Sequence, residues 1–239
     1  MKPKKDLFAQ LVERLSRHCL FQGMSADEVA AVAERLGGGL RHFKKGDEII
    51  REGSDARWLM PVLTGIVSVY ETMANGEPHL VRVIEAGALF GTTFVTLPLA
   101  KYPCSLVATQ ACEVVFFDIE RVRGLWHESA YRRFFENLYT VVSGYVLYCT
   151  RKLSILACKT TEEKFLFYLG WYASDSGSND VTLPFARAED CATFLGVTRV
   201  SLHRAVRQLA ESGRIRHVGR GHFVLNQMAN SLRPDSLRP

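Results

Sequence analysis

The sequence lacks three features that would place it in a membrane or outside the cell. None of its apolar runs reaches the roughly 18 residues that a transmembrane helix requires. The basic N-terminus, MKPKKDLFAQLVERL, has neither the apolar core nor the cleavage site of a secretory signal peptide. The six cysteines are scattered through the chain, which is typical of buried thiols in a reducing compartment. We therefore expect a cytoplasmic protein that does not bind membranes.

Signatures of catalysis and of metal binding are absent as well. The sequence contains no Walker loop, no recognisable nucleophile–base pair and no metal-binding motif, and this argues against an enzyme. His18, His42, His79 and His127 show no metal-ligand spacing among them, so we expect surface or hydrogen-bonded histidines. Haem stays an alternative, because one histidine can suffice as its proximal ligand.

The strongest pattern lies near the C-terminus, between residues 188 and 213. The segment AEDCATFLGVTRVSLHRAVRQLAESG reads as two helices separated by Gly196, with Thr198 as the N-cap of the second helix. Helical spacing gives each helix one apolar face: Ala188, Cys191, Ala192 and Leu195 in the first, and Leu202, Ala205, Val206 and Leu209 in the second. The pattern predicts a helix-turn-helix.

The opposite face of the second helix carries long hydrogen-bond donors. It presents Arg199, Val200, His203, Arg204 and Arg207, and spacings of four pair Arg199 with His203 and Val200 with Arg204. Residues 215–225, IRHVGRGHFVL, follow as a predicted β-hairpin wing. Residues 186–225 contain seven arginines against three acidic residues, a formal charge of +4. A basic module of this kind suits the major groove of double-stranded DNA.

The N-terminal half follows a different pattern. Residues 7–18 form a predicted amphipathic helix, and a capping box at residues 25–28 opens a second helix. Between Leu40 and Asp118 short alternating segments recur at about ten-residue spacing, and Asn75-Gly76 marks a two-residue hairpin. These features predict an antiparallel β-roll of roughly eight strands, followed by a short helix that Asp118 caps.

A long helix is predicted from about Ser129 to Ala157. Its apolar stripe, which includes Leu138 and Val142, is too wide for one partner. We therefore expect one side to pack on the roll and the other side, with Leu138 and Val142, to pair with a second copy of the chain. A further capping box at residues 160–163 opens a new, buried helix, so residues 158–160 form the predicted boundary and hinge.

The order of these parts resembles the CRP/FNR family of bacterial transcription regulators over residues 20–225. The resemblance rests on the roll glycines, on the long helix, and on Gly196, Val197, Thr198 and Arg199 with Arg204; the roll glycines occur in the segments 45–47, 52–53, 65–70 and 87–91. It implies an α+β fold: a double-stranded β-roll (jelly roll) of cyclic-nucleotide-binding type, a dimerisation helix and a winged helix-turn-helix domain. It also implies a homodimer that reads a palindromic promoter site and contacts RNA polymerase.

With this resemblance the chain divides into four parts. We expect an effector-sensing domain at 1–128, the dimerisation helix at 129–157, the DNA-binding domain at 158–226 and a disordered tail at 227–239. The predicted DNA-binding residues are Thr198, Arg199, Val200, Ser201, His203, Arg204, Arg216 and Arg220. The resemblance assigns guanine reading to Arg199 and Arg204, and it places Val200 where the family commonly has an acidic residue.

The sequence departs from the cyclic-AMP-binding members at the effector site. Thr92 stands where those proteins hold the ribose with Glu, and Tyr102-Pro103 stand where they bind the cyclic phosphate with Arg-Ser. Their two polar long-helix positions are Val146 and Leu147 here. A buried phosphate without its guanidinium is unfavourable, so we expect an uncharged or aromatic effector. The predicted effector-binding residues are Gly91, Thr92, Tyr102, Pro103, Cys104, Tyr145, Val146 and Tyr148.

Other sensing chemistries stay open at this point. A redox-, haem- or gas-sensing or thiol-sensing regulator of the same family is one alternative. An iron–sulfur cluster is disfavoured, because Cys19 is the only N-terminal cysteine and cannot supply the thiolates alone. A second alternative is an effector-independent DNA-binding dimer whose roll serves only as a scaffold.

Overall fold

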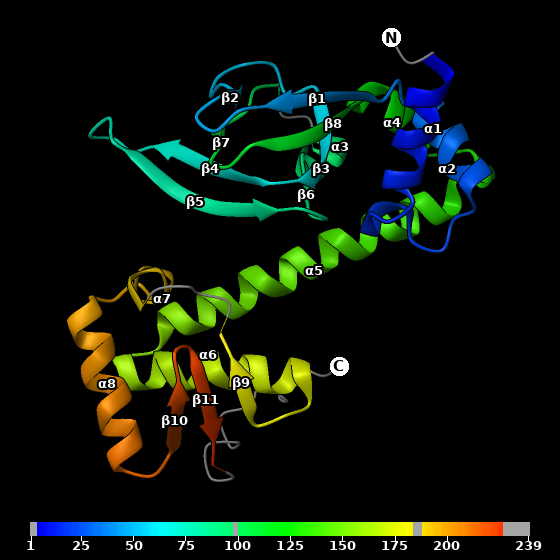
Figure 1. The fold of residues 1–239 in the computed structure, drawn as a ribbon. Helices are drawn as coiled ribbons and strands as arrows, with labels where there is room; N and C mark the ends of the chain where they lie inside the picture. Colours follow the sequence, from blue (N-terminus) through cyan, green and yellow to red (C-terminus); the bar gives the residue numbers. More distant parts are fainter. Residues whose placement is uncertain (1–3, 98–99, 184–187, 227–239) are drawn as a thin grey trace. The chain divides into compact units, whose positions relative to one another are not determined.

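The computed structural model describes residues 4–97, 100–183 and 188–226. The chain forms two compact units, Met1–Tyr145 and Val146–Pro239, and the boundary between them falls inside the long helix α5 (Arg132–Ala157) (Figure 1). No helix among the described residues is both long enough and apolar enough to cross a bilayer. The tail predicted to be disordered, residues 227–239, lies outside the described residues.

The first unit begins with three short helices: α1 (Lys4–Leu15), the 3₁₀ helix η1 (Cys19–Phe21) and α2 (Ala26–Arg35). The predicted capping box of α2 is present, with Ser25 and Glu28 bonded reciprocally. Helix α1 ends three residues before the predicted end at His18. The reason is local, since the His18 ring accepts a hydrogen bond from the backbone N–H of Leu20 and so caps η1.

The body of this unit is an antiparallel β-roll, as predicted, and its last strand ends at Asp118. One sheet has the order β1-β8-β3-β6 and the other β2-β7-β4-β5. The strands are β1 (Gly39–Phe43), β2 (Glu48–Ile50), β3 (Trp58–Thr64), β4 (Ile66–Thr72), β5 (Pro78–Glu85), β6 (Leu89–Phe90), β7 (Ser105–Ala108) and β8 (Cys112–Asp118). A hairpin joins β4 to β5 around Asn75-Gly76, as predicted, but residues 73–77 separate the two strands, so the loop is longer than the two residues expected; Gly76 has φ +82° (Figure 1).

Three helices complete the first unit: α3 (Thr92–Thr96), α4 (Ile119–Gly124) and the 3₁₀ helix η2 (Ser129–Tyr131), with α5 continuing from η2. Asp118 caps α4 by accepting from the Glu120 N–H at 2.9 Å, as the sequence predicts. Phe134 and Leu138 of α5 are buried in the core of this unit. Leu138 was expected on the dimer face; that expectation was wrong, because its side chain is already covered by the roll-side core.

The second unit contains the last part of α5 and six further elements. They are α6 (Thr161–Ser176), β9 (Asp180–Thr182), α7 (Ala188–Leu195), α8 (Arg199–Glu211), β10 (Ile215–Gly219) and β11 (His222–Leu225). Thr160 and Glu163 form the predicted capping box of α6. The sequence analysis missed β9, because three residues carry no alternation; its ladder with β11, which pairs Val181 with Phe223, makes it a strand.

The last turns of α5 are tied into this second unit. Ile155 is fully buried there. The Tyr148 ring lies 5.7 Å from that of Trp171, and the Lys152 ammonium lies 3.5 Å from the centre of the Phe194 ring. Burial lowers the pKa of Lys152 to about 8. The end of α5 is therefore a structural part of the C-terminal unit.

Candidate DNA interface and effector-domain interior

The helix-turn-helix is built by local signals that the sequence already carries. Gly196 has φ +63°, a conformation that favours glycine, and so reverses the chain after α7. Thr198 caps α8 by accepting from the Ser201 N–H at 3.1 Å. Leu202, Ala205 and Leu209 are buried, and Val206 is partly buried. The predicted turn, cap and buried face of this motif are confirmed, and they fix which side of α8 faces outward.

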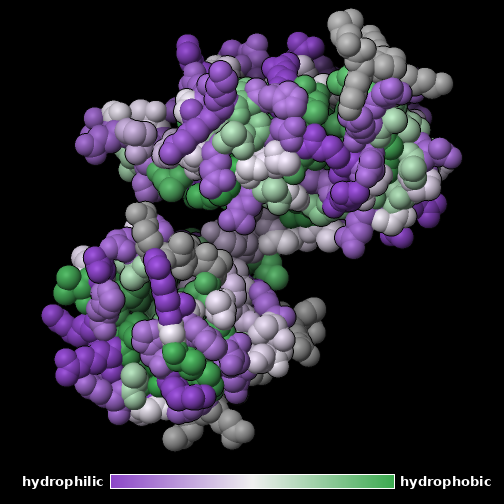
Figure 2. Space-filling view, viewed as in Figure 1, coloured by the Kyte–Doolittle hydropathy of each residue, from purple (hydrophilic) through white to green (hydrophobic). Residues whose placement is uncertain are grey.

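The outward side of α8 is occupied by the side chains that the sequence singled out. Arg199, Val200, His203, Arg204 and Arg207 are all exposed. Figure 2 shows mainly hydrophilic side chains over this part of the second unit. The apolar side chain of Val200 is 68% exposed, so it does not contribute to the core of this unit. The face can offer guanidinium donors and one apolar methyl pair to a ligand.

Arg199 is held on two sides. Its Nη1 lies 2.6 Å from Glu189 Oε1 on α7, and its Nε donates to His203 Nε2 at 3.4 Å. The spacing of four predicted the contact with His203. The contact with Glu189 was missed, because it links two helices and no spacing along one helix reveals it. Among the described residues, no carboxylate pairs with Arg204 in this way.

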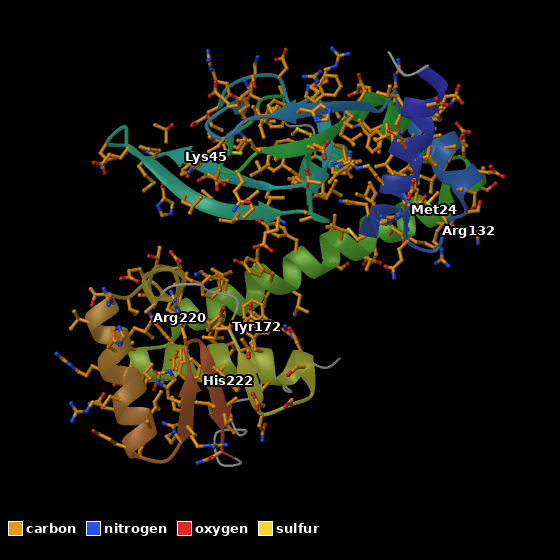
Figure 3. All side chains as sticks on the ribbon, viewed as in Figure 1. Met24, Lys45, Arg132, Tyr172, Arg220 and His222 are labelled. Atoms are coloured by element: carbon orange, nitrogen blue, oxygen red, sulfur yellow. The ribbon has the colours of Figure 1, made fainter. Side chains whose placement is uncertain are left out.

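The wing follows α8 as predicted. Strands β10 and β11 pair around the turn at Arg220-Gly221, and Gly221 has φ +70°. Arg216 and Arg220 are exposed, and Arg220 stands at the turn of the wing (Figure 3). The His217 ring stacks on Phe223 at 4.8 Å, which stiffens the hairpin. Ser201, another predicted DNA-binding residue, is partly buried, and its hydroxyl oxygen accepts from the Thr198 hydroxyl at 2.9 Å.

Inside the roll, Tyr102 takes the place of a charged anchor. Its ring is buried and lies 4.9 Å from Phe94 and 6.0 Å from Phe90. Its hydroxyl accepts from the backbone N–H groups of Arg57 at 3.1 Å and Trp58 at 2.8 Å. Burial raises the pKa of the Tyr102 hydroxyl above its ordinary value. A neutral, hydrogen-bonded aromatic group thus stands where the resemblance places a guanidinium.

Gly91 and Thr92 lie beside this aromatic group. Gly91 has φ +96°, and a Cβ there would lie 2.3 Å from the carbonyl oxygen of Trp58. The close approach of α3 to β3 therefore requires glycine. Thr92 is partly buried at the start of α3, and Cys104 is buried, which raises the pKa of its thiol to about 11. Pro103 is exposed.

The remaining predicted effector residues lie on α5. Tyr145 is partly buried, and the Arg82 guanidinium of β5 lies 4.5 Å from its ring centre. Val146 is exposed and belongs to the second unit, as does Tyr148, whose ring also lies 6.4 Å from Phe194. The structure thus gathers Gly91, Thr92, Tyr102 and Cys104 within the first unit.

The histidines and cysteines have local structural roles. His18 is buried; its Nε2 lies 3.1 Å from the Ala88 carbonyl oxygen, and its Nδ1 accepts from Leu20 N–H. Both ring nitrogens are therefore used, and His18 offers no free nitrogen to a haem iron. Cys112 and Cys191 are buried like Cys104, whereas Cys19 is exposed. Within the described part of the chain, no three His, Cys, Asp or Glu side chains are grouped to hold a metal ion.

A shallow hollow of about 420 Å³ lies beside the start of α5, and the sequence analysis missed it. Trp126, Phe135 and Tyr139 line it together with Arg132, which is labelled in Figure 3. The Trp126 and Phe135 rings are 4.9 Å apart. Glu128 and Glu136 also line it, so its charge is mixed.

Comparisons with known proteins agree with this architecture. Residues 40–129 match the cyclic nucleotide-binding domain family. No curated protein sequence matches the chain. Among solved structures, FixK2 from Bradyrhizobium japonicum is 20% identical, with 82% of this chain and 96% of that chain covered and a TM-score of 0.55.

Two further structures have the same fold. The c-di-GMP responsive global regulator CLP of Xanthomonas campestris is 20% identical, with 82% of this chain and 98% of that chain covered and a TM-score of 0.56. A CooA mutant from Carboxydothermus hydrogenoformans is 16% identical, with 90% and 92% covered and a TM-score of 0.62. Residues 40–129 therefore match the cyclic nucleotide-binding domain family, and 82–90% of the chain shares its fold with these solved structures of CRP/FNR type.

Proposed function

We propose that the protein is a DNA-binding transcription regulator of the CRP/FNR type, acting as a homodimer in the cytoplasm without catalytic activity. The observation that carries the proposal is the outward face of α8. A helix capped at Thr198 and fixed on α7 presents Arg199, Val200 and Arg204 to solvent. Side chains at the N-terminal end of a recognition helix are those that contact base edges in the major groove.

Each side chain in this set has a distinct role in the proposal. Arg199 and Arg204 each donate to guanine O6 and N7, and Val200 packs on a thymine methyl group. Thr198 caps the N-terminal end of α8, and His203 holds the Arg199 side chain in place. Ser201, Arg216 and Arg220 contact phosphates, which adds affinity without sequence preference. We also propose that the DNA-bound protein contacts RNA polymerase when it acts as an activator.

The dimer is proposed to form along α5. Tyr139, Val146 and Leu153 are exposed at intervals of seven residues, and Leu153 is 67% exposed. Val142, Cys149 and Leu156 follow them at intervals of three residues. This alternation of three and four is the pattern of a two-stranded coiled coil. Reading two half-sites on one DNA face requires the two recognition helices of such a dimer to be about 34 Å apart.

The effector is proposed to be a small uncharged or aromatic molecule rather than cyclic AMP. The proposed contact set within the first unit is Gly91, Thr92, Tyr102, Pro103, Cys104 and Tyr145. The hydrophobic ring and neutral hydroxyl of Tyr102 cannot replace the charge that a buried phosphate needs. That the CLP regulator of this fold is c-di-GMP responsive is consistent with an effector site that changes within one fold.

A second candidate is a DNA-binding dimer that needs no effector. It is favoured by the packing of Tyr102, whose ring contacts Phe90 and Phe94 and whose hydroxyl is already satisfied. In this case the roll is a scaffold. The two candidates differ in whether any small molecule changes the affinity of the protein for its DNA site.

The decisive experiment selects binding sites from random duplex DNA with the full-length protein. The proposal expects one palindromic motif with guanines in each half-site. Genome-wide mapping of bound sites then identifies the regulated genes, and these indicate effectors to test in DNA-binding titrations. The control is the double variant Arg199→Ala/Arg204→Ala, which lacks both proposed base-reading arginines. If the wild-type protein enriched no motif more strongly than this variant, the proposed function would be contradicted.

A further inference from the structure

The two arginines that we assign to base reading are not equivalent. Arg199 contacts Glu189 at 2.6 Å and His203 at 3.4 Å, so acceptors from α7 and from the next turn of α8 hold its guanidinium. Within the described residues Arg204 has no such acid. The contact to His203 requires its neutral ring, with Nε2 unprotonated and acting as the acceptor. Neither arginine belongs to the cap of α8 or to its buried face.

We infer that Glu189 is a positioning residue that sets the specificity of Arg199 for guanine. The inference rests on the proposed function, since it concerns how the same face reads DNA. A guanidinium has five N–H donors; the hydrogen bond to His203 uses Nε–H, and the ion pair with Glu189 lies at Nη1. The remaining N–H donors are enough for a bidentate contact with guanine O6 and N7.

The physical benefit is preorganisation. A free arginine side chain loses rotamer freedom when it binds a base, and this loss weakens the bound state. Arg199 already loses part of its rotamer freedom on folding, because contacts from α7 and α8 fix the position of its guanidinium. An exposed ion pair contributes little in water. DNA that covers this face removes water, lowers the local dielectric and strengthens the pair at the moment of binding.

The same carboxylate has an opposite effect on general affinity. Glu189 adds a negative charge beside the DNA phosphates and so weakens binding to every sequence. Removing it raises affinity for random DNA while lowering the preference for guanine. A residue with no positioning role changes only the first quantity, so the two effects can be separated by experiment.

Glu211 supplies a matched control on the same helix. It pairs with Arg207 Nε at 2.7 Å. The two side chains of this pair are more exposed than the two side chains of the Arg199–Glu189 pair. Glu211→Ala removes the same charge, but Arg207 is not one of the base-reading arginines. Glu189→Gln is a second control, because glutamine loses the charge and keeps an oxygen that accepts from Arg199.

The test measures dissociation constants of the full-length variants for duplexes that differ at one base pair. That base pair is the one whose preference Arg199→Ala abolishes in site selection. Glu189→Ala is expected to lower the discrimination for guanine about three- to tenfold. Glu189→Gln should lower it less, and Glu211→Ala should leave it unchanged. All three variants should bind random DNA more tightly than the wild type, by a similar factor.

Equal discrimination in Glu189→Ala and Glu211→Ala would overturn the inference and leave the proposed function intact. His203→Ala gives an independent check, since it removes the second acceptor and should also lower guanine discrimination. If the wild-type protein showed no preference among duplexes, the proposed function would fail and the role of Glu189 with it. Denaturation midpoints of the variants establish that each one is folded at the assay temperature.

Discussion

The Tyr102 hydroxyl accepts a 2.8 Å hydrogen bond from the backbone N–H of Trp58, and this bond joins the segment before β7 to the start of β3. The same hydroxyl accepts from Arg57 N–H at 3.1 Å. One side chain thus accepts hydrogen bonds from two backbone donors. Tyr102 is thus part of the internal structure of the roll.

Replacing Tyr102 with Phe should destabilise the protein by about 1–3 kcal/mol, because it removes the acceptor of two part-buried backbone N–H groups while keeping the ring contacts. Urea denaturation followed by fluorescence measures the change. Tyr70→Phe is the control, since Tyr70 also lies in the roll but its hydroxyl makes no hydrogen bond to another described residue, and it should show almost no effect. Equal stability of the two variants would mean that water replaces the Tyr102 hydroxyl.

Cyclic AMP should not bind the protein at micromolar concentration, because Thr92 and Tyr102 provide neither a ribose carboxylate nor a phosphate guanidinium. Calorimetric titration of the full-length protein tests this directly. A heat signal that saturates at one nucleotide per chain in the micromolar range would refute the expectation.

Stability should depend on pH through His18. Burial lowers the pKa of His18 below 6.5, so the unfolded chain binds a proton at higher pH than the folded protein does. The contribution is complete above about pH 6.5 and is lost as the pH falls through the lower folded-state pKa. Urea midpoints should therefore decrease between pH 7.5 and pH 5.

The control for this effect is His18→Asn, whose side-chain oxygen can still accept from Leu20 N–H but does not titrate. Its urea midpoint should change less over the same pH interval. The same slope in both proteins would assign the pH dependence to other groups.

Two glycines should respond in opposite directions to alanine. Gly144 lies inside α5, and a Cβ there would meet no atom within 4 Å, so Gly144→Ala should stabilise the protein by about 0.5–1 kcal/mol. Gly65 has φ +78°, and its Cβ would lie 2.1 Å from the Ala111 carbonyl oxygen. Gly65→Ala should be strongly destabilising. Thermal denaturation distinguishes the two, and a destabilised Gly144→Ala would indicate that the helix needs flexibility there.

The proposed dimer should be broken at Leu153 and not at Leu138. Leu153→Glu places a charge in the exposed stripe of α5 and should yield a folded monomer with weak DNA binding. Leu138→Glu buries a charge in the first unit and should unfold it. Sedimentation velocity with circular dichroism separates these outcomes. A dimeric Leu153→Glu variant would place the interface elsewhere.

DNA readout should distinguish base contacts from phosphate contacts. Arg204→Ala should weaken binding to the preferred site by about 1–3 kcal/mol and relax the base preference at one position of the motif. Losing Arg220 should weaken all sequences similarly and reduce the salt dependence of binding. Val200→Glu should change the preferred base where Val200 contacts the groove, and an identical selected motif in both proteins would show that Val200 reads no base.

Much of the local structure was predictable because short-range signals carry it. The capping boxes at Ser25 and Thr160, the cap at Thr198 and the turn at Gly196 depend on neighbours within four residues. Alternation gave the number of roll strands, since it records which residues face a core. The outward face of α8 followed from the same logic, and with it most of the proposed DNA-contacting side chains.

Only the tertiary structure decided which of two residues of the same type makes contacts within the protein. Leu138 and Leu153 are both apolar residues of α5, yet one is buried and the other exposed. Strand β9 exists only because β11 offers it a ladder. Tyr102 could have been a ligand contact, but two backbone N–H groups from another strand engage its hydroxyl. Arg199 and Arg204 are identical as sequence letters, and only the approach of α7 gives one of them an acidic partner, because such contacts depend on distances that no local pattern encodes.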